Sequence, residues 1–81
     1  MNLYYNVIYT IESIDGENKG FIYQGILLRE DKETLQIQDI NAEQIFIIHK
    51  KRFNEECKII GKQYPNYPIF IPDSTYTITI S

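Results

Sequence analysis

The chain has 81 residues, of which 43% are hydrophobic and 23% charged, and it carries a formal net charge of −3. A chain of this length is too short for two independent cores, so we expect one domain spanning residues 1–81. The composition is that of a folded globular protein and excludes a disordered chain. The negative charge argues against general attraction to nucleic-acid phosphates, because that attraction needs clustered Lys and Arg.

Signals for targeting or membrane insertion are absent from the sequence. Residues 1–6 lack the basic region and apolar stretch of a signal peptide. The longest apolar run, residues 45–48, is far shorter than the roughly 18 residues that cross a bilayer. Cys57 is the single cysteine, which excludes an intrachain disulfide and suits a reducing compartment. We therefore expect a soluble, cytoplasmic protein that does not contact membranes.

The first third of the chain reads as two strands joined by a tight turn. From Asn2 to Ser13, one face of an extended chain would carry Leu3, Tyr5, Val7, Tyr9 and Ile11. Residues 15–20 are rich in Asp, Gly and Asn, which favour a reversal of the chain. Residues 21–30 are apolar on both faces, so they predict a strand buried on both sides near its middle, with a bulge or bend at Gly25.

The middle of the chain predicts two further strands that continue an antiparallel meander. After the charged reversal at residues 29–33, residues 34–39 alternate, which places Leu35 and Ile37 inward and Gln36 and Gln38 outward. A turn follows, and residues 44–49 form a short, almost fully apolar strand.

The last third is less regular. Phe53, Cys57 and Ile60 follow helical spacing, which favours a short helix near residues 51–58. Residues 61–72 contain all three prolines and predict an ordered but irregular loop. Residues 76–80 alternate with Thr and predict a final strand, which we expect to pair with the first strand. The prediction is a mainly β fold of about five antiparallel strands in a small barrel or sandwich.

The run Phe21-Ile22-Tyr23-Gln24-Gly25-Ile26-Leu27-Leu28-Arg29-Glu30-Asp31, followed by Leu35-Gln36-Ile37, resembles the first half of an Sm-like barrel, one of the small SH3-like barrels. The resemblance covers roughly residues 20–49 and implies a barrel topology with a tendency to pair at strand edges or to form rings. Leu35 falls about where an Sm protein would have its RNA-binding Asn, and the second half lacks an Arg-Gly or Lys-Gly motif. The resemblance therefore transfers no functional residue.

Residues suited to catalysis or metal binding are sparse. His49 and Cys57 lie eight residues apart and could form a dyad if the segment between them folds back, but both border apolar runs that favour a packing role. One His and one Cys are too few for a structural zinc site. The chain also lacks a Gly-rich phosphate loop. We expect a non-enzymatic protein with no cofactor and no metal.

An aromatic and proline-rich set near the C-terminal end is the leading candidate for a binding surface. Its aromatic members are Tyr64, Tyr67 and Phe70, its prolines are Pro65 and Pro68, and Tyr4 and Tyr5 could join it. Such side chains offer large, rigid area to a protein partner, although the same loop could instead cover the open end of the barrel. The leading hypothesis is a small interaction module, of the kind found among phage or mobile-element accessory and inhibitor proteins, that binds a protein partner and could form a homo-oligomer.

The alternative hypothesis is nucleic-acid binding. The only concentrated positive charge is the run His49, Lys50, Lys51 and Arg52, with Phe53 beside it for base stacking. The same run could simply be the polar end of a strand. A third hypothesis is a small ligand-binding barrel that uses His49.

Overall fold

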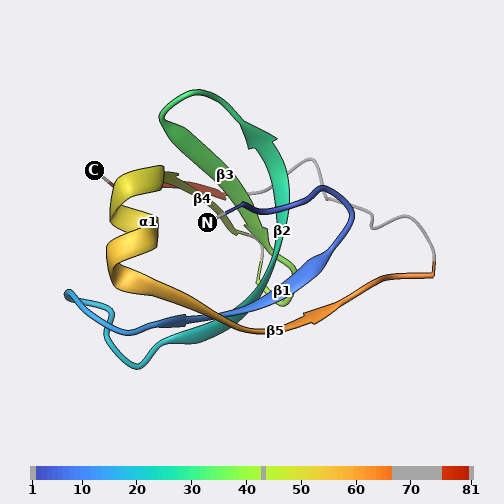
Figure 1. The fold of residues 1–81 in the computed structure, drawn as a ribbon, viewed down its shortest axis with the longest axis horizontal. Helices are drawn as coiled ribbons and strands as arrows, with labels where there is room; N and C mark the ends of the chain where they lie inside the picture. Colours follow the sequence, from blue (N-terminus) through green and yellow to red (C-terminus); the bar gives the residue numbers. More distant parts are fainter. Residues whose placement is uncertain (1, 43, 67–75, 81) are drawn as a thin grey trace.

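The computed structural model describes residues 2–42, 44–66 and 76–80, and within them it contains one short helix and one six-stranded sheet (Figure 1). The prediction of a mainly β fold with a short helix is confirmed. The elements in chain order are β1 (Ile8–Ser13), β2 (Ile22–Glu30), β3 (Thr34–Asp39), β4 (Gln44–His49), α1 (Lys50–Glu56), β5 (Cys57–Gln63) and β6 (Tyr76–Ile80). Within the described ranges, no helix is long and apolar enough to cross a membrane.

The strands lie in the order β5-β1-β2-β3-β4-β6. Neighbouring strands are antiparallel except β4 and β6, which are parallel. Figure 1 shows that the sheet is curled, so that β1 and β5 lie across from β3 and β4, while α1 lies beside one end of the curl. The predicted meander of β2, β3 and β4 is confirmed.

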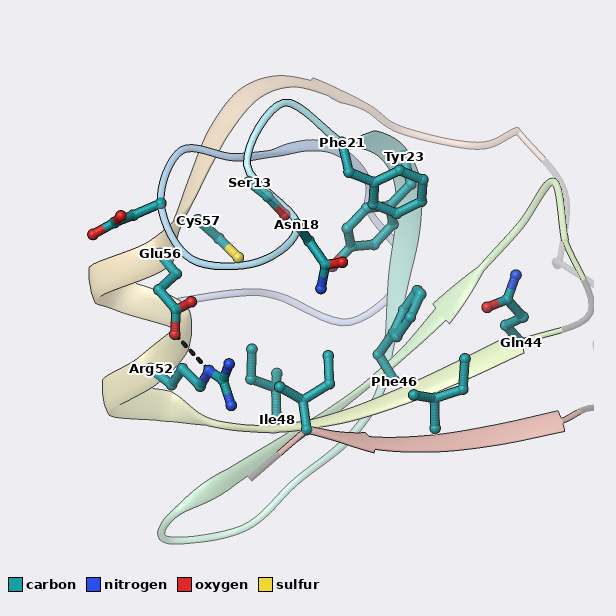
Figure 2. A pocket seen from close by; sticks show the side chains of 13 residues that line it. Ser13, Asn18, Phe21, Tyr23, Gln44, Phe46, Ile48, Arg52, Glu56 and Cys57 are labelled. Atoms are coloured by element: carbon teal, nitrogen blue, oxygen red, sulfur yellow. Dashed lines mark hydrogen bonds and ion pairs between the residues drawn. The ribbon is translucent and has the colours of Figure 1, made fainter.

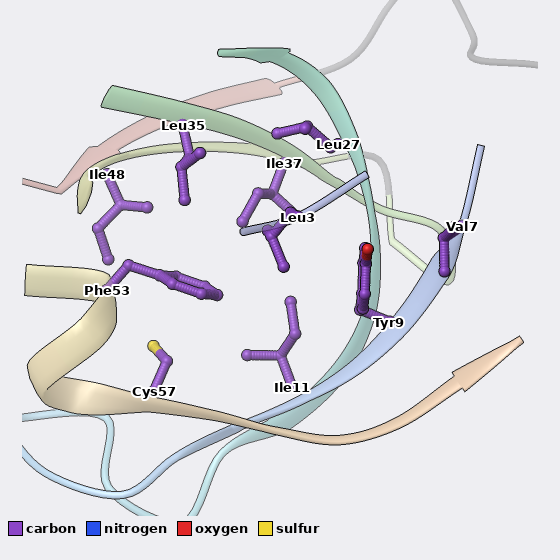
Figure 3. Packing of buried hydrophobic residues seen from close by; sticks show 10 residues of the cluster. All are labelled: Leu3, Val7, Tyr9, Ile11, Leu27, Leu35, Ile37, Ile48, Phe53 and Cys57. Carbon is purple, nitrogen blue, oxygen red and sulfur yellow. The ribbon is translucent and has the colours of Figure 1, made fainter. Parts of the chain in front are cut away.

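The core fills the inside of this curl (Figure 3). The largest fully buried side chains are Ile11 from β1, Ile37 from β3 and Phe53 from α1. A helix as short as α1 is marginal on its own, and it has no side-chain cap. The burial of Phe53 therefore contributes strongly to holding α1 against the sheet.

The first strand is shorter than predicted. It begins at Ile8 rather than Asn2, because Asn6 adopts a positive φ of 62° that interrupts the extended chain. Leu3 and Val7 are nevertheless buried as expected, whereas Tyr5 is exposed. The interruption turns the N-terminal segment so that Leu3 enters the core (Figure 3).

The irregularity in β2 lies after Gly25 rather than at it. The register of β2 against β3 shifts between Leu27 and Arg29. At Gly25 a Cβ atom would come within 2.6 Å of the Ile37 Cγ2 atom, so the glycine permits close approach of β3. Gln38 also differs from its prediction: it is buried, and its amide nitrogen donates hydrogen bonds to the carbonyls of Asp39 and Ala42.

The C-terminal third differs most from prediction. Cys57 is not helical but begins β5, which continues to Gln63 and so occupies the start of the predicted loop. β5 takes the edge beside β1 that we expected the last strand to fill, and β6 pairs with β4 instead. A bulge at Ile60 lets β5 follow the curled β1. Residues 67–72 of the predicted loop lie outside the described residues.

Candidate functional site

Three exposed tyrosines lie toward one end of the β1–β5 pair. Tyr4, Tyr5 and Tyr64 are 67%, 53% and 66% exposed, and we call them the tyrosine surface. Ile8, the first residue of β1, lies opposite Gln63, the last residue of β5. Tyr64 therefore follows β5 at the same end of the two strands at which the N-terminal segment enters β1. The backbone N–H of Tyr4 donates a 2.7 Å hydrogen bond to the hydroxyl of the buried Tyr9. That bond ties the N-terminal segment to the core.

Two aromatic members of the predicted binding surface, Tyr67 and Phe70, lie outside the described residues. The three predicted tyrosines that can be placed, Tyr4, Tyr5 and Tyr64, are solvent-exposed.

An open strand edge adjoins the tyrosine surface. Within the described ranges, β5 pairs only with β1, so its other edge faces no strand. Lys58, Ile60 and Lys62 of β5 are exposed. Lysines and bulges on an edge strand discourage unselective pairing between copies, and they leave a positively charged edge.

The basic run is less positive in the structure than in the sequence. His49 is exposed at the end of β4, and Lys51 is exposed on α1. Lys50 pairs with Glu30 at 2.9 Å, and Arg52 pairs with Glu56 at 2.5 Å. Two of its three permanent charges therefore face carboxylates, which weakens the run as a phosphate-binding patch.

A pocket of about 430 Å³, which we call the hairpin pocket, opens between the β1–β2 hairpin loop, α1 and strands β4 and β6 (Figure 2). No pattern in the sequence predicted this pocket. One wall is aromatic and aliphatic, with side chains from the hairpin loop and from β2, β4 and β6: Phe21, Tyr23, Phe46, Ile48, Ile78 and Ile80. A volume of this size falls within the range of small-molecule sites, about 300–1,000 Å³.

The aromatic wall is built of three rings in contact. The rings of Phe21 and Tyr23 are stacked, with centroids 5.4 Å apart, and those of Tyr23 and Phe46 are tilted, with centroids 5.1 Å apart. Burial raises the pKa of the Tyr23 phenol above its ordinary value, and the negative forms of Cys57 and Asp39 raise it further. The phenol therefore stays protonated and neutral at physiological pH.

The opposite wall is polar but has little net charge. The ion pair of Arg52 and Glu56 lies there, and the thiol of Cys57 is close to Ser13 (Figure 2). Burial raises the pKa of the Cys57 thiol, an effect that a hydrogen bond with Ser13 partly opposes. A protonated thiol is a weak nucleophile.

The possible dyad of His49 and Cys57 is not formed. The two residues flank α1, whose seven residues correspond to about 10 Å of helix axis. His49 is exposed and does not line the hairpin pocket, whereas Cys57 does. Within the described ranges, no three His, Cys, Asp or Glu side chains gather as a metal site.

The hairpin loop is held against the end of α1, which sets the shape of the pocket. The N–H of Ile14 donates a 2.7 Å hydrogen bond to the Glu56 carbonyl, and the N–H of Gly20 donates one of 2.7 Å to the Ser13 carbonyl. Gly16 has a φ of 84°, and a Cβ at this position would overlap the Glu56 carboxylate. Glycine at this position lets the loop lie against the Glu56 side chain without displacing it.

No family model, curated protein or solved structure matches the chain. The resemblance of residues 20–49 to Sm-like barrels therefore stays a prediction.

Proposed function

We propose that this chain is a small non-enzymatic module that binds an extended, acidic segment of a partner protein. The site would be the tyrosine surface together with the open edge of β5. The observation that carries the proposal is the register of β1 against β5, which brings exposed Tyr64 to the end of the strand pair next to the N-terminal segment.

The tyrosines suit a protein interface because their rings bury a large area at little cost in side-chain entropy. Truncating a central tyrosine of an interface to alanine typically costs about 2 kcal/mol or more of binding energy. Here Tyr4 and Tyr64 are mostly exposed, so the free protein gains little stability from their side chains.

The strand edge supplies the second part of the interface. An added strand would pair its backbone with the edge of β5 that faces no strand among the described residues, a common way to bind an extended peptide. The exposed lysines of this edge, Lys58 and Lys62, favour carboxylates in that peptide. A protein partner is preferred over nucleic acid because Lys50 and Arg52 of the basic run already face Glu30 and Glu56.

The proposal is tested by affinity capture from host lysate with the tagged protein, after nuclease treatment. We expect a partner protein that wild type retains and that the double variant Tyr4→Ala/Tyr64→Ala loses. Ile22→Ala is the matched control, because Ile22 is also exposed and lies on β2. All three proteins should melt at similar temperatures, since surface substitutions usually change stability by less than about 0.5 kcal/mol.

Two outcomes would contradict the proposal. If the partner is captured only when nuclease is omitted, the binding depends on nucleic acid and is better assigned to the basic run. A double variant that unfolds would mean that Tyr4 and Tyr64 serve the core rather than a partner.

A further inference from the structure

We propose that the hairpin pocket is a second, separate site that binds a neutral, flat aromatic small molecule with a hydrogen-bonding group on its edge. The pocket and the tyrosine surface lie at opposite ends of the β1–β5 pair: Ser13, which pairs with Cys57, lines the pocket, whereas the pair of Ile8 and Gln63 lies at the tyrosine end. The two sites can therefore be tested independently.

The aromatic wall determines the shape of the ligand. Phe21 is 45% exposed even though its ring stacks on Tyr23, so a large apolar face remains open to the pocket mouth. Flat aromatic molecules stack on or tilt against such rings at the spacing that the Tyr23–Phe46 pair already shows. Ile78 and Ile80 of β6 contribute aliphatic surface.

The charges around the pocket determine the charge of the ligand. Arg52 already pairs with Glu56, so it offers no excess positive charge to an anion. The third charged lining residue, Asp15, is exposed, and its carboxylate accepts a hydrogen bond from the Gly16 N–H. Tyr23 and Cys57 are neutral because burial raises the pKa of each. An anionic ligand would lose its hydration without gaining a counter-charge.

The polar groups of the pocket determine where the ligand's hydrogen-bonding edge lies. Figure 2 shows the Asn18 amide directed into the pocket, between the rings and the ion pair. An amide offers both a donor and an acceptor, and the Ser13 hydroxyl lies on the same side of the pocket. A neutral donor or acceptor on the ligand's edge would find a partner there.

The test uses a pair of fluorescent probes that share one aromatic body. N-phenyl-naphthylamine is neutral and has an N–H at its edge, and anilinonaphthalene sulfonate adds one negative charge. We expect the neutral probe to bind wild-type protein at a single saturable site, at least tenfold more tightly than the sulfonate. Amide resonances that shift on titration should lie in the hairpin loop and in α1.

Phe21→Ala should weaken the neutral probe about tenfold, which corresponds to about 1.4 kcal/mol, and Ile78→Trp should block binding by filling the pocket from β6. Ile22→Ala is the control, because Ile22 follows Phe21 in sequence, is similarly exposed and does not line the pocket. Both Phe21 and Ile78 are partly exposed, so the variants should fold, which thermal melts will check.

Three results would each overturn the proposal. They are a sulfonate that binds as tightly as the neutral probe, a Phe21→Ala protein that binds like wild type, and resonance shifts centred on the tyrosine surface.

Discussion

The contact between Gly16 and Glu56 can be isolated by comparing two glycines of one loop. Gly16 and Gly20 have φ values of 84° and 94°, so alanine at either position should incur the same backbone strain, about 1–2 kcal/mol. A Cβ at Gly16 would overlap the Glu56 carboxylate, whereas a Cβ at Gly20 has no heavy atom within 4 Å. The two substitutions therefore share the cost of backbone strain, but only Gly16→Ala adds the cost of the overlap with Glu56.

The difference in stability between the two alanine variants depends on the interaction that Glu56 loses when its side chain moves. Its carboxylate is at the end of a flexible side chain and can move, but it then loses the ion pair with Arg52. Both side chains of that pair are partly exposed, which limits its contribution to about 0.2–1 kcal/mol. We expect Gly16→Ala to destabilise the protein by about 0.5–1 kcal/mol more than Gly20→Ala.

Urea denaturation of four proteins measures this coupling. The set is Gly16→Ala, Gly20→Ala, Glu56→Ala and the double variant Gly16→Ala/Glu56→Ala. Because the overlap needs both groups, the double variant should be less destabilised than the sum of the two single changes. Equal losses for the two glycine variants, together with additive single changes, would refute the loop-to-helix contact.

Two further predictions concern the core and the turn between β2 and β3. Phe53→Ala should lower the free energy of unfolding by about 3–5 kcal/mol, because the side chain is fully buried. The total free energy of unfolding for a chain this long is about 4–12 kcal/mol, so the urea midpoint should fall markedly. A midpoint near that of wild type would contradict the role of Phe53 in the core. Hydrogen bonds from the Thr34 hydroxyl and from the N–H groups of Glu33 and Thr34 lower the pKa of Asp31 to about 2. The Asp31 carboxylate therefore stabilises the protein above its ordinary pKa, and this contribution is lost as the pH falls from about 4 to about 2. Asp31→Asn should flatten the plot of unfolding free energy against pH over that range. An unchanged slope in the variant would contradict the lowered pKa of Asp31.

Local alternation predicted the middle of the fold well. Leu35 and Ile37 are buried as expected, because one face of β3 contacts the core and a period of two places them both there. Gln38 was predicted to be exposed because polar residues usually are, but the carbonyls of Asp39 and Ala42 satisfy its amide nitrogen in a buried position.

The C-terminal third could not be predicted in this way because its pairing is non-local. The segment Cys57–Gln63 has a pattern that fits helix or strand, and only β1, more than 40 residues earlier in the sequence, selects the strand. The parallel pairing of β6 with β4 likewise has no sequence signal in residues 76–80.

The tyrosine surface was predicted in part and the hairpin pocket not at all. Tyr4 and Tyr64 could be proposed from residue type alone, since their role depends on exposure. The pocket combines a loop, a helix and five of the strands, and residues such as Phe21 and Tyr23 read in sequence as ordinary strand positions. The spacing of Arg52 and Glu56, one helical turn apart, was the available hint of a fixed polar wall.

Within the described ranges, β6 pairs with β4 alone, and Thr77, Ile78 and Thr79 are exposed. An edge strand held by one neighbouring strand is a unit that can detach while the rest of the protein remains folded. Detachment would remove Ile78 and Ile80 from the hairpin pocket and at the same time uncover the backbone of β4. We therefore expect occupancy of the pocket and protection of the β4 edge to be linked: a molecule bound in the pocket should slow hydrogen exchange along β4 and keep that edge closed to other chains.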